Sequence, residues 1–459
     1  MENIEEKALE RFRGALRIET VWPDGTENDD KAVTAAQERL GAFQSYLVSA
    51  FPEFHAAAER HAFGPFGVAY RWPAARGSRA DTPLPVLLIA HYDVVPAEAE
   101  HWSVPPFSAE TVNGEVYARG TLDTKNTLMA CLEAANRLCA EGFAPSRDLW
   151  FAFGGDEERS GLNGAKAMAD WFRERGIRFD WLLDEGGVVA KNGFPGVKKS
   201  LALVGIEEKG FLDLVLSVKQ EPGHSSRPPE TQAVAVLARA LLRVSKKPFP
   251  YSLIPSVEGF FRRLGEISPG PRGFALRHAR LLGPLFFRIA AVSPLVRSFL
   301  RTTCAMTQLF GSEADNILPS EASAVLNLRL LPGWSVQRAT EWVRTAVKDS
   351  RVEVAVNPRR SANDPVAAPD GAERGEGPGW EEMRKAIGAS FPHAATVPYL
   401  MTATTDSRHY APLCRGVYRF APAELTAEEV GLIHGHDERI SEENYLKGIA
   451  FYRALMGAL

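Results

Sequence analysis

Between residues 84 and 190, short apolar runs that resemble buried strands alternate with segments that have the apolar spacing of helices. The apolar runs are PVLLIAHYDVV, DLWFAFGG and FDWLLDEGG, and the helical segments between them are KNTLMACLEAANRLCAE and GLNGAKAMADWFRERG. Strands joined by crossover helices form a mainly parallel sheet with helices on both faces. We therefore predict an α/β domain built on such a sheet.

From about residue 208 the pattern changes to strand, helix, strand, strand, helix and strand. The segments are FLDLVLSVK, TQAVAVLARALLRV, TTCAMTQLF, SAVLNLRLL, SVQRATEWVRTAV and VEVAV. This βαββαβ order can form a small α+β domain of its own. A polar linker rich in Gly and Pro follows, and then helix and strand patterns resume. We predict that 1–207 and 364–459 form one domain and that 208–363 is a second domain inserted into it.

Composition limits the partners and the location. The chain has 459 residues, with 53 basic and 57 acidic side chains and a net charge of −4, so nothing indicates a nucleic-acid partner. Its four cysteines show no C-x-x-C spacing, which suits reduced thiols. The first residues form a charged helical pattern without the apolar centre of a signal peptide. We therefore expect a cytoplasmic protein.

One apolar segment, LLGPLFFRIAAVSPLVRSFL at 281–300, is about long enough to cross a bilayer. Pro284, Arg288, Pro294 and Arg297 interrupt it. An arginine in the middle of a membrane costs roughly 2.5–3.5 kcal/mol on insertion scales. We therefore predict no membrane span here, and expect helices that pack on the protein itself.

Histidines and carboxylates follow the apolar runs of the first domain. They are His91, Asp93, Asp123, Asp156, Glu157, Glu158, Asp184 and Glu185, joined near the carboxyl terminus by His434, His436, Asp437 and Glu438. Because the carboxyl ends of parallel strands lie along one edge of a sheet, these residues should meet there. Imidazole with carboxylate suits zinc, with manganese or cobalt as alternatives. A pair of divalent ions sharing a carboxylate would also hold together acidic groups that otherwise repel one another.

Eight segments of the chain resemble the successive motifs of one enzyme family. They are HYDVVP, ARGTLDTKN, GGDEERSG, LLDEGG, EPGHSSRPP, DNILPSEASA, TTDSRHY and HGHDE. The family is that of the dinuclear zinc peptidases, which includes aminoacylase, carboxypeptidase S, succinyl-diaminopimelate desuccinylase and glutamate carboxypeptidase. The long insert at about 246–300, followed by RTTCAMTQLFGS, is most similar to the carboxypeptidase S branch, which includes N-fatty-acyl amino acid hydrolases. The resemblance implies hydrolysis of the amide bond in N-acyl amino acids or short peptides that carry a free carboxylate.

The resemblance also implies a set of metal ligands. The matched residues are His91, Asp123, Glu158, Glu185 and His434, with Asp123 bridging two ions and with Glu158 and His434 on the same ion. Asp93 matches the acid that orients the His91 imidazole through its second nitrogen. Asp184 remains an alternative to Glu185, because a slip of one residue along the strand exchanges the two.

Four further matches concern catalysis and substrate binding. Glu157 matches the general base, which takes a proton from the attacking water and returns it to the leaving amine. His224 matches a lid histidine that stabilises the oxyanion and that comes from the partner subunit in aminoacylase, which suggests a homodimer. Asn316 matches an asparagine that contacts a substrate oxygen, and Arg408 an arginine that pairs with the substrate carboxylate.

Alternatives remain at this point. The insert at 246–300 either packs in the core of an enlarged lid or forms an apolar wall for the acyl group. An aminopeptidase or dipeptidase on the same metal site would need a pocket for a free amine, against which Arg408 argues. A binding protein without activity would normally have lost a ligand or the base, and the sequence retains all of them.

Overall fold

The computed structural model describes residues 4–22, 29–75, 83–194, 197–358 and 361–459. Its larger part is built on an eight-stranded sheet with the order β1-β2-β6-β3-β7-β16-β8-β15. The strands are β1 (Glu59–Ala62), β2 (Gly67–Trp72), β3 (Val86–His91), β6 (Leu149–Gly154), β7 (Phe179–Ala190), β8 (Leu201–Glu208), β15 (Ala395–Met401) and β16 (Cys414–Leu425). The central strands β6, β3, β7 and β16 run parallel to one another, which confirms the predicted mainly parallel sheet.

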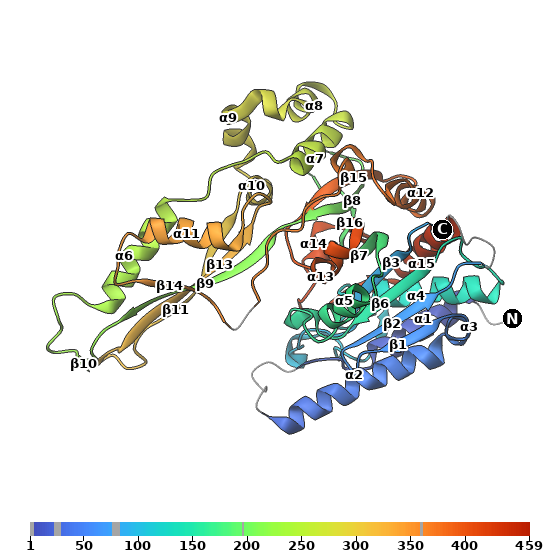
Figure 1. Ribbon diagram of the computed structural model, residues 1–459, viewed down its shortest axis with the longest axis horizontal. Coiled ribbons are helices and arrows are strands. Elements are labelled where there is room, and N and C mark those ends of the chain that lie inside the picture. The colour runs from blue at the N-terminus through green and yellow to red at the C-terminus, as the bar shows by residue number, and fades with distance from the viewer. Residues whose placement is uncertain (1–3, 23–28, 76–82, 195–196, 359–360) are drawn as a thin grey trace.

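Helices cover both faces of this sheet, as predicted (Figure 1). Along β3, Val86, Leu88 and Ala90 enter the main core, whereas Leu87 and Ile89 enter a smaller cluster on the other face. Six helices contribute to the main core: α1 (Ile4–Leu16), α2 (Asp30–Ala50), α3 (Pro52–Ala57), α4 (Lys125–Ala140), α12 (Trp380–Ser390) and α15 (Glu442–Gly457). The opposite face is covered by α5 (Ala165–Glu174) and α13 (Ser407–Tyr410).

The smaller part is an inserted α+β unit with a four-stranded antiparallel sheet of order β11-β13-β9-β14 (Figure 1). Its elements are β9 (Gly210–Lys219), α6 (Ala233–Lys246), β11 (Thr303–Phe310), β13 (Glu321–Leu330), α11 (Val336–Val347) and β14 (Glu353–Val356). This is the predicted βαββαβ order. Only Lys209 separates β8 of the large sheet from β9 of the small one. The exact boundaries after 207 and 363 stay predictions.

The insert at 246–300 forms four helices, α7 (Pro255–Glu266), α8 (Gly270–Arg277), α9 (Ala279–Ala290) and α10 (Pro294–Leu300). Phe299 lies 5.5 Å from Tyr399 of β15 between ring centroids, and the hydroxyl of Ser256 donates to the carboxylate of Glu207. The base of the insert therefore packs against the edge of the large sheet, and α8 and α9 lie at the upper edge of the molecule in Figure 1. Among the described residues, no helix combines the length and apolar character that crossing a membrane requires. A cytoplasmic location stays a prediction.

Short elements complete the fold. They are β4 (Glu110–Val112), β5 (Glu115–Tyr117), β10 (Gly223–His224), β12 (Ile317–Leu318), β17 (Arg439–Ser441), α14 (Ala427–Val430) and the 3-10 helices η1 (Ala99–His101), η2 (Glu157–Arg159), η3 (Ala372–Arg374) and η4 (Ala411–Leu413). The small sheet β17-β5-β4 brings the carboxy-terminal region beside the segment that leads to Asp123. The four cysteines are unpaired, as predicted.

Candidate metal centre

The five predicted metal ligands meet at the carboxyl edge of the large sheet. His91 ends β3, Glu185 lies in β7, and Glu158 lies in η2, which follows β6. Asp123 occupies the turn before α4, and His434 lies between α14 and β17. Five segments that are far apart in the sequence thus deliver one side chain each to the same edge of the sheet, where β3 and β6 end and β7 carries Glu185.

Asp123 lies between the two histidines. Its Oδ1 is 2.9 Å from Nε2 of His91, and its Oδ2 is 3.0 Å from Nε2 of His434. Each histidine also faces a second carboxylate: Glu185 Oε1 is 3.3 Å from the Nε2 of His91, and Glu158 Oε1 is 3.1 Å from the Nε2 of His434. The geometry therefore forms two groups of one histidine and two carboxylates that share Asp123, the arrangement expected of a bridging ligand.

Asp93 organises the turn that carries the predicted base. Its carboxylate accepts the backbone N–H of Glu157 at 3.1 Å and that of Glu158 at 3.0 Å. The same carboxylate lies 3.3 Å from Nδ1 of His91, whose other nitrogen faces Asp123. One buried aspartate thus fixes the ring of His91 and the backbone that presents Glu157 and Glu158.

Asp184 and Glu185 point in different directions. The carboxylate of Asp184 accepts the N–H of Ser407 at 2.9 Å and the N–H of Glu185 at 2.8 Å. Asp184 therefore holds the first residue of α13. The side chain of Glu185 instead faces His91 and lines a cavity at this edge of the sheet. Of the two alternatives, the structure places Glu185 with the other predicted ligands.

The electrostatics of the cluster fit a divalent metal. Burial raises the pKa of Glu157 well above its usual range, and burial together with the charge of Asp123 raises the pKa of Glu185 to about 8. Asp123 behaves differently: although it is buried, hydrogen bonds from His434 and His91 hold its pKa below the usual range. Donor atoms of His91, Asp123 and Glu158 lie within 4.8 Å of one another, as do those of His91, Glu157 and Glu185. Cations among these oxygens would keep the carboxylates charged, so the donor set suits metal ions.

Arg408 lies on the wall of the same cavity, which has a volume of about 450 Å³. Its guanidinium donates to the carbonyl oxygens of Thr405 and Ser160, each at 2.9 Å, and lies 3.9 Å from the carboxylate of Glu157. Neutral carbonyls fix its position without cancelling its charge. A fixed guanidinium beside the base can receive a substrate carboxylate.

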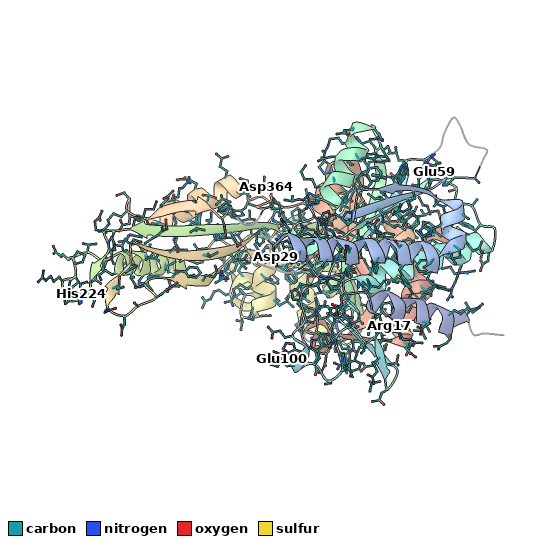
Figure 2. The ribbon with its side chains drawn as sticks, turned by 90° about the horizontal axis from the view of Figure 1, so that it is seen from below. Arg17, Asp29, Glu59, Glu100, His224 and Asp364 are labelled. Carbon is teal, nitrogen blue, oxygen red and sulfur yellow. The ribbon has the colours of Figure 1, made fainter. Side chains whose placement is uncertain are left out.

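His224 and Asn316 lie away from this cluster. The pairing of β10 with β12 brings them together, and the N–H of Ser225 donates to the carbonyl of Asn316 at 3.0 Å. Figure 2 shows His224 at the outer end of the inserted unit. Nδ1 of His224 accepts the N–H of Ser226 at 3.1 Å, so the proton of the neutral ring is on Nε2. The structure does not bring these two residues to the ligands of the same chain.

Glu438 supports the site in a way that the sequence analysis missed. Its fully buried carboxylate accepts the N–H of Leu122 at 2.7 Å and that of Gly120 at 3.1 Å, and it pairs with Arg119 at 2.6 Å. These contacts hold the turn that presents Asp123. The HGHDE motif placed Glu438 near the site, but its partners lie more than 300 residues away and no local pattern reveals them.

Arg329 of β13 was also missed. It lines the same cavity as Arg408, and its guanidinium lies 5.0 Å from the ring centroid of Phe211. In the sequence it is the one charged residue of the mainly apolar run SAVLNLRLL. That interruption was a signal, but the run does not say which face meets the cavity.

The chain is similar to proteins of one known family. Residues 87–458 match the model of peptidase family M20/M25/M40. The chain is 34% identical to the human N-fatty-acyl-amino acid synthase/hydrolase PM20D1, over 96% of this chain and 86% of that protein. It is 33% identical to the probable carboxypeptidase S-like 2 of Dictyostelium discoideum, over 90% of this chain and 78% of that protein.

The fold is shared with solved structures as well. The M20 family metallo-carboxypeptidase Sso-CP2 of Sulfolobus solfataricus has a TM-score of 0.68 at 17% identity, with 98% of each chain covered. Human carnosine dipeptidase 1 has a TM-score of 0.66 at 14% identity, with 99% of this chain and 97% of that one covered. The chain therefore belongs to peptidase family M20/M25/M40 and, as the sequence predicts, is a metal-dependent hydrolase of amide bonds.

Proposed function

We propose that this protein hydrolyses the amide bond of N-acyl amino acids, or of short peptides, whose released amino acid carries a free carboxylate. The observation that carries the proposal is Arg408, which is fixed on the wall of the cavity that also holds Glu157 and the predicted ligands. The names of two relatives, an N-fatty-acyl-amino acid synthase/hydrolase and a carboxypeptidase S-like protein, support the same substrate class.

We propose two divalent metal ions, zinc in the first place with manganese or cobalt as alternatives. His91, Asp123 and Glu185 would hold one ion, and Asp123, Glu158 and His434 the other, because these residues already face one another in those two groups. Such ions, when bound, supply Lewis acidity that lowers the pKa of water and polarises a carbonyl.

Glu157 acts as the proton carrier in this proposal. It accepts a proton from the attacking water and gives it to the nitrogen of the leaving amino acid, so that one carboxyl group serves as base and then as acid. Burial supports that role, because it raises the pKa of Glu157 well above its usual range and so favours the protonated form that the second step requires. Asp93 keeps the residue in place through its backbone N–H.

The cavity walls support a substrate with one apolar end and one anionic end. Leu122, Val188, Leu425 and Ile433 line the cavity together with Arg408. We propose that the acyl group lies against these apolar side chains while the carboxylate pairs with the guanidinium. No residue of 246–300 is among the lining residues of this cavity, so the insert does not enter the proposed acyl site.

The exposed position of His224 supports a homodimer. We propose that His224 of the partner subunit reaches the metal site, where its Nε2–H stabilises the oxyanion, and that Asn316 of the partner subunit contacts a substrate oxygen. Strand β11 supports the contact between subunits, because it is an edge strand whose Met306, Leu309 and Phe310 are exposed. Exposed apolar edge strands readily pair with a second copy. In this arrangement 208–363 serves as lid and 1–207 with 364–459 as catalytic domain.

Substrate selectivity tests the proposal. The purified protein is stripped of metal with a chelator, reloaded with zinc, manganese or cobalt, and assayed for release of amine from three substrates. They are an N-acyl amino acid, its C-terminal amide, and a dipeptide with a free amine and a blocked carboxyl group. We expect cleavage of the free acid alone. Cleavage of the blocked dipeptide in preference to the acid would instead make the protein an aminopeptidase.

A further inference from the structure

The outer helices of the insert expose a group of large apolar side chains. They are Phe274, Leu281, Leu285, Ile289, Val292 and Leu295, which we call the apolar cap. Leu281, Val292 and Ile289 are 81%, 79% and 68% exposed. Single exposed leucines are common on soluble proteins, but six large apolar residues within 22 positions indicate a surface that contacts something.

The apolar cap does not serve the protein's own core. In the second half of α9, past a kink at Gly283, Phe286 is buried and packs against Phe261 of α7 at 5.0 Å between ring centroids. Leu285 and Ile289, four residues apart on the same half, remain exposed. This helix is thus apolar on a core-facing side and on a solvent-facing side. A helix with apolar side chains on two sides normally has a second apolar neighbour.

The charged side chains of the same region are all positive. Residues 267–312 contain six arginines and no aspartate or glutamate, in a chain whose net charge is −4. Arg280 pairs with Glu258 of α7 at 2.6 Å, whereas the guanidinium of Arg277 donates to the neutral carbonyl of Gly265 and so keeps its full charge. A basic apolar surface on an acidic protein favours an anionic, apolar partner.

A second copy of the chain fits this surface poorly. A two-fold interface places the same patch of both subunits face to face, so the arginines around the apolar cap would meet their own copies. Anionic lipid headgroups would instead neutralise them while the acyl region takes up the leucines. The helices α8, α9 and α10 have 8, 12 and 7 residues, and about 20 are needed to span a bilayer, so they can only lie on its surface.

We propose that the apolar cap docks this protein onto lipid surfaces that contain anionic lipids. Phe274, Leu281, Leu285, Ile289, Val292 and Leu295 enter the acyl region of the leaflet that faces the protein, and the surrounding arginines contact the headgroups. The docking surface is separate from the metal centre, since none of its residues lines that cavity. The proposal therefore does not depend on which substrate the metal centre cleaves.

Vesicle flotation of the purified full-length protein tests the proposal. The vesicles are phosphatidylcholine with or without phosphatidylserine. We expect the wild-type protein to float with the anionic vesicles, and to float less as salt is added. The double variant Leu285→Glu with Ile289→Glu should bind about a hundredfold more weakly, because two aliphatic side chains no longer enter the lipid. Arg288→Gln should weaken binding to anionic vesicles by about fivefold and leave the neutral vesicles unchanged.

A matched control uses exposed apolar residues elsewhere. Ile4→Glu with Val48→Glu changes two exposed side chains of the large domain and should float like the wild type. Hydrolysis of a water-soluble short-chain amide in the absence of vesicles should be unchanged in every variant, which shows that each is folded. Equal flotation of the wild type and the Leu285/Ile289 variant would overturn the proposal. So would a wild-type protein that does not float, or a Leu285/Ile289 variant that changes from dimer to monomer.

Discussion

Two regions of the molecule carry the proposed chemistry and differ in how firmly their side chains are held. The sheet edge contains the proposed metal ligands, and the lid tip is the turn at His224. At the sheet edge, Nε2 of the buried His91 lies 2.9 Å from the carboxylate of Asp123 and 3.3 Å from that of Glu185. At the lid tip, His224 is exposed, and its imidazole ring bonds only the N–H of Ser226 in its own turn. The first region is complete within one chain, whereas the second needs another surface to act on. We infer that metal binding belongs to one subunit and oxyanion stabilisation to the contact between two.

The largest expected effect concerns the shared ligand at the sheet edge. Asp123→Ala should remove both metal ions from the folded protein and abolish hydrolysis, because one carboxylate serves each ion. Metal content measured by plasma mass spectrometry, beside circular dichroism for folding, checks this. Asp437→Ala is the control, since that carboxylate bonds Ser103 and should leave the metal content intact. Two metal equivalents retained by Asp123→Ala would rule out the bridging role.

The next effect separates the base from the ligands beside it. Glu157→Gln should keep the metal and the fold but slow turnover by about 10²–10⁴-fold, the usual contribution of general acid–base catalysis. Steady-state kinetics together with metal analysis distinguish the roles. If the variant loses metal in proportion to activity, Glu157 is a ligand, and the sheet edge lacks the base assigned to it.

The two arginines of the cavity give a smaller and more selective effect. Arg408→Ala should lower kcat/KM for the free acid. The loss should correspond to roughly 2–5 kcal/mol of transition-state stabilisation, the range for truncating one partner of a buried charge pair. Arg329→Ala, on the lid side of the same cavity, is the matched variant and should cost less. Comparing both variants on the acid and on its C-terminal amide locates the carboxylate. A larger loss of kcat/KM for Arg329→Ala than for Arg408→Ala would mean that Arg329 of the lid, and not Arg408, binds the substrate carboxylate.

The smallest effect concerns the junction between the two regions. Lys209 is buried between β8 and β9 and donates to the carbonyls of Ser298 and Arg301, each at 3.0 Å. Burial lowers its pKa to about 7, so between pH 7 and about pH 10 the folded protein binds fewer protons than the unfolded chain. Burial of Lys209 therefore lowers the free energy of unfolding at pH 7, and this destabilisation decreases as the pH rises.

Thermal unfolding of the wild type and of Lys209→Met checks that sign. The Tm of the wild type should rise relative to that of the variant from pH 7 to about pH 10, while turnover on a saturating substrate changes little. A difference in Tm that is constant over this range would mean that Lys209 stays charged in the fold.

Local patterns predicted the central elements closely. The helix predicted at 125–141 is α4, Lys125–Ala140, because glycine-flanked apolar runs and helical spacing are local signals. The ligands His91 and Glu158 could be placed at or just after strand ends for the same reason, whereas the strand expected to end at Glu185 continues to Ala190. Strand β8 was not assigned, although its run LALVGI is apolar, and its pairing with β15 and β16 joins segments about 190 or more residues apart. The support of Asp123 by Glu438 and the distance of His224 from the ligands are also nonlocal, and no spacing in the sequence encodes them.

Mixing two inactive variants tests the division of chemistry between subunits most directly. In Glu157→Gln the sheet edge lacks its base but the lid tip is intact, and in His224→Ala the reverse holds. His224→Ala alone should lower kcat by about 10²–10³-fold, as for the loss of an oxyanion donor, with little change in KM. After the two variants are mixed and their subunits exchanged, each mixed dimer contains one site with Glu157 and with His224 of the partner subunit. We predict that hydrolysis rises well above the sum of the separate variants, whereas activity equal to that sum would contradict a site completed by the partner.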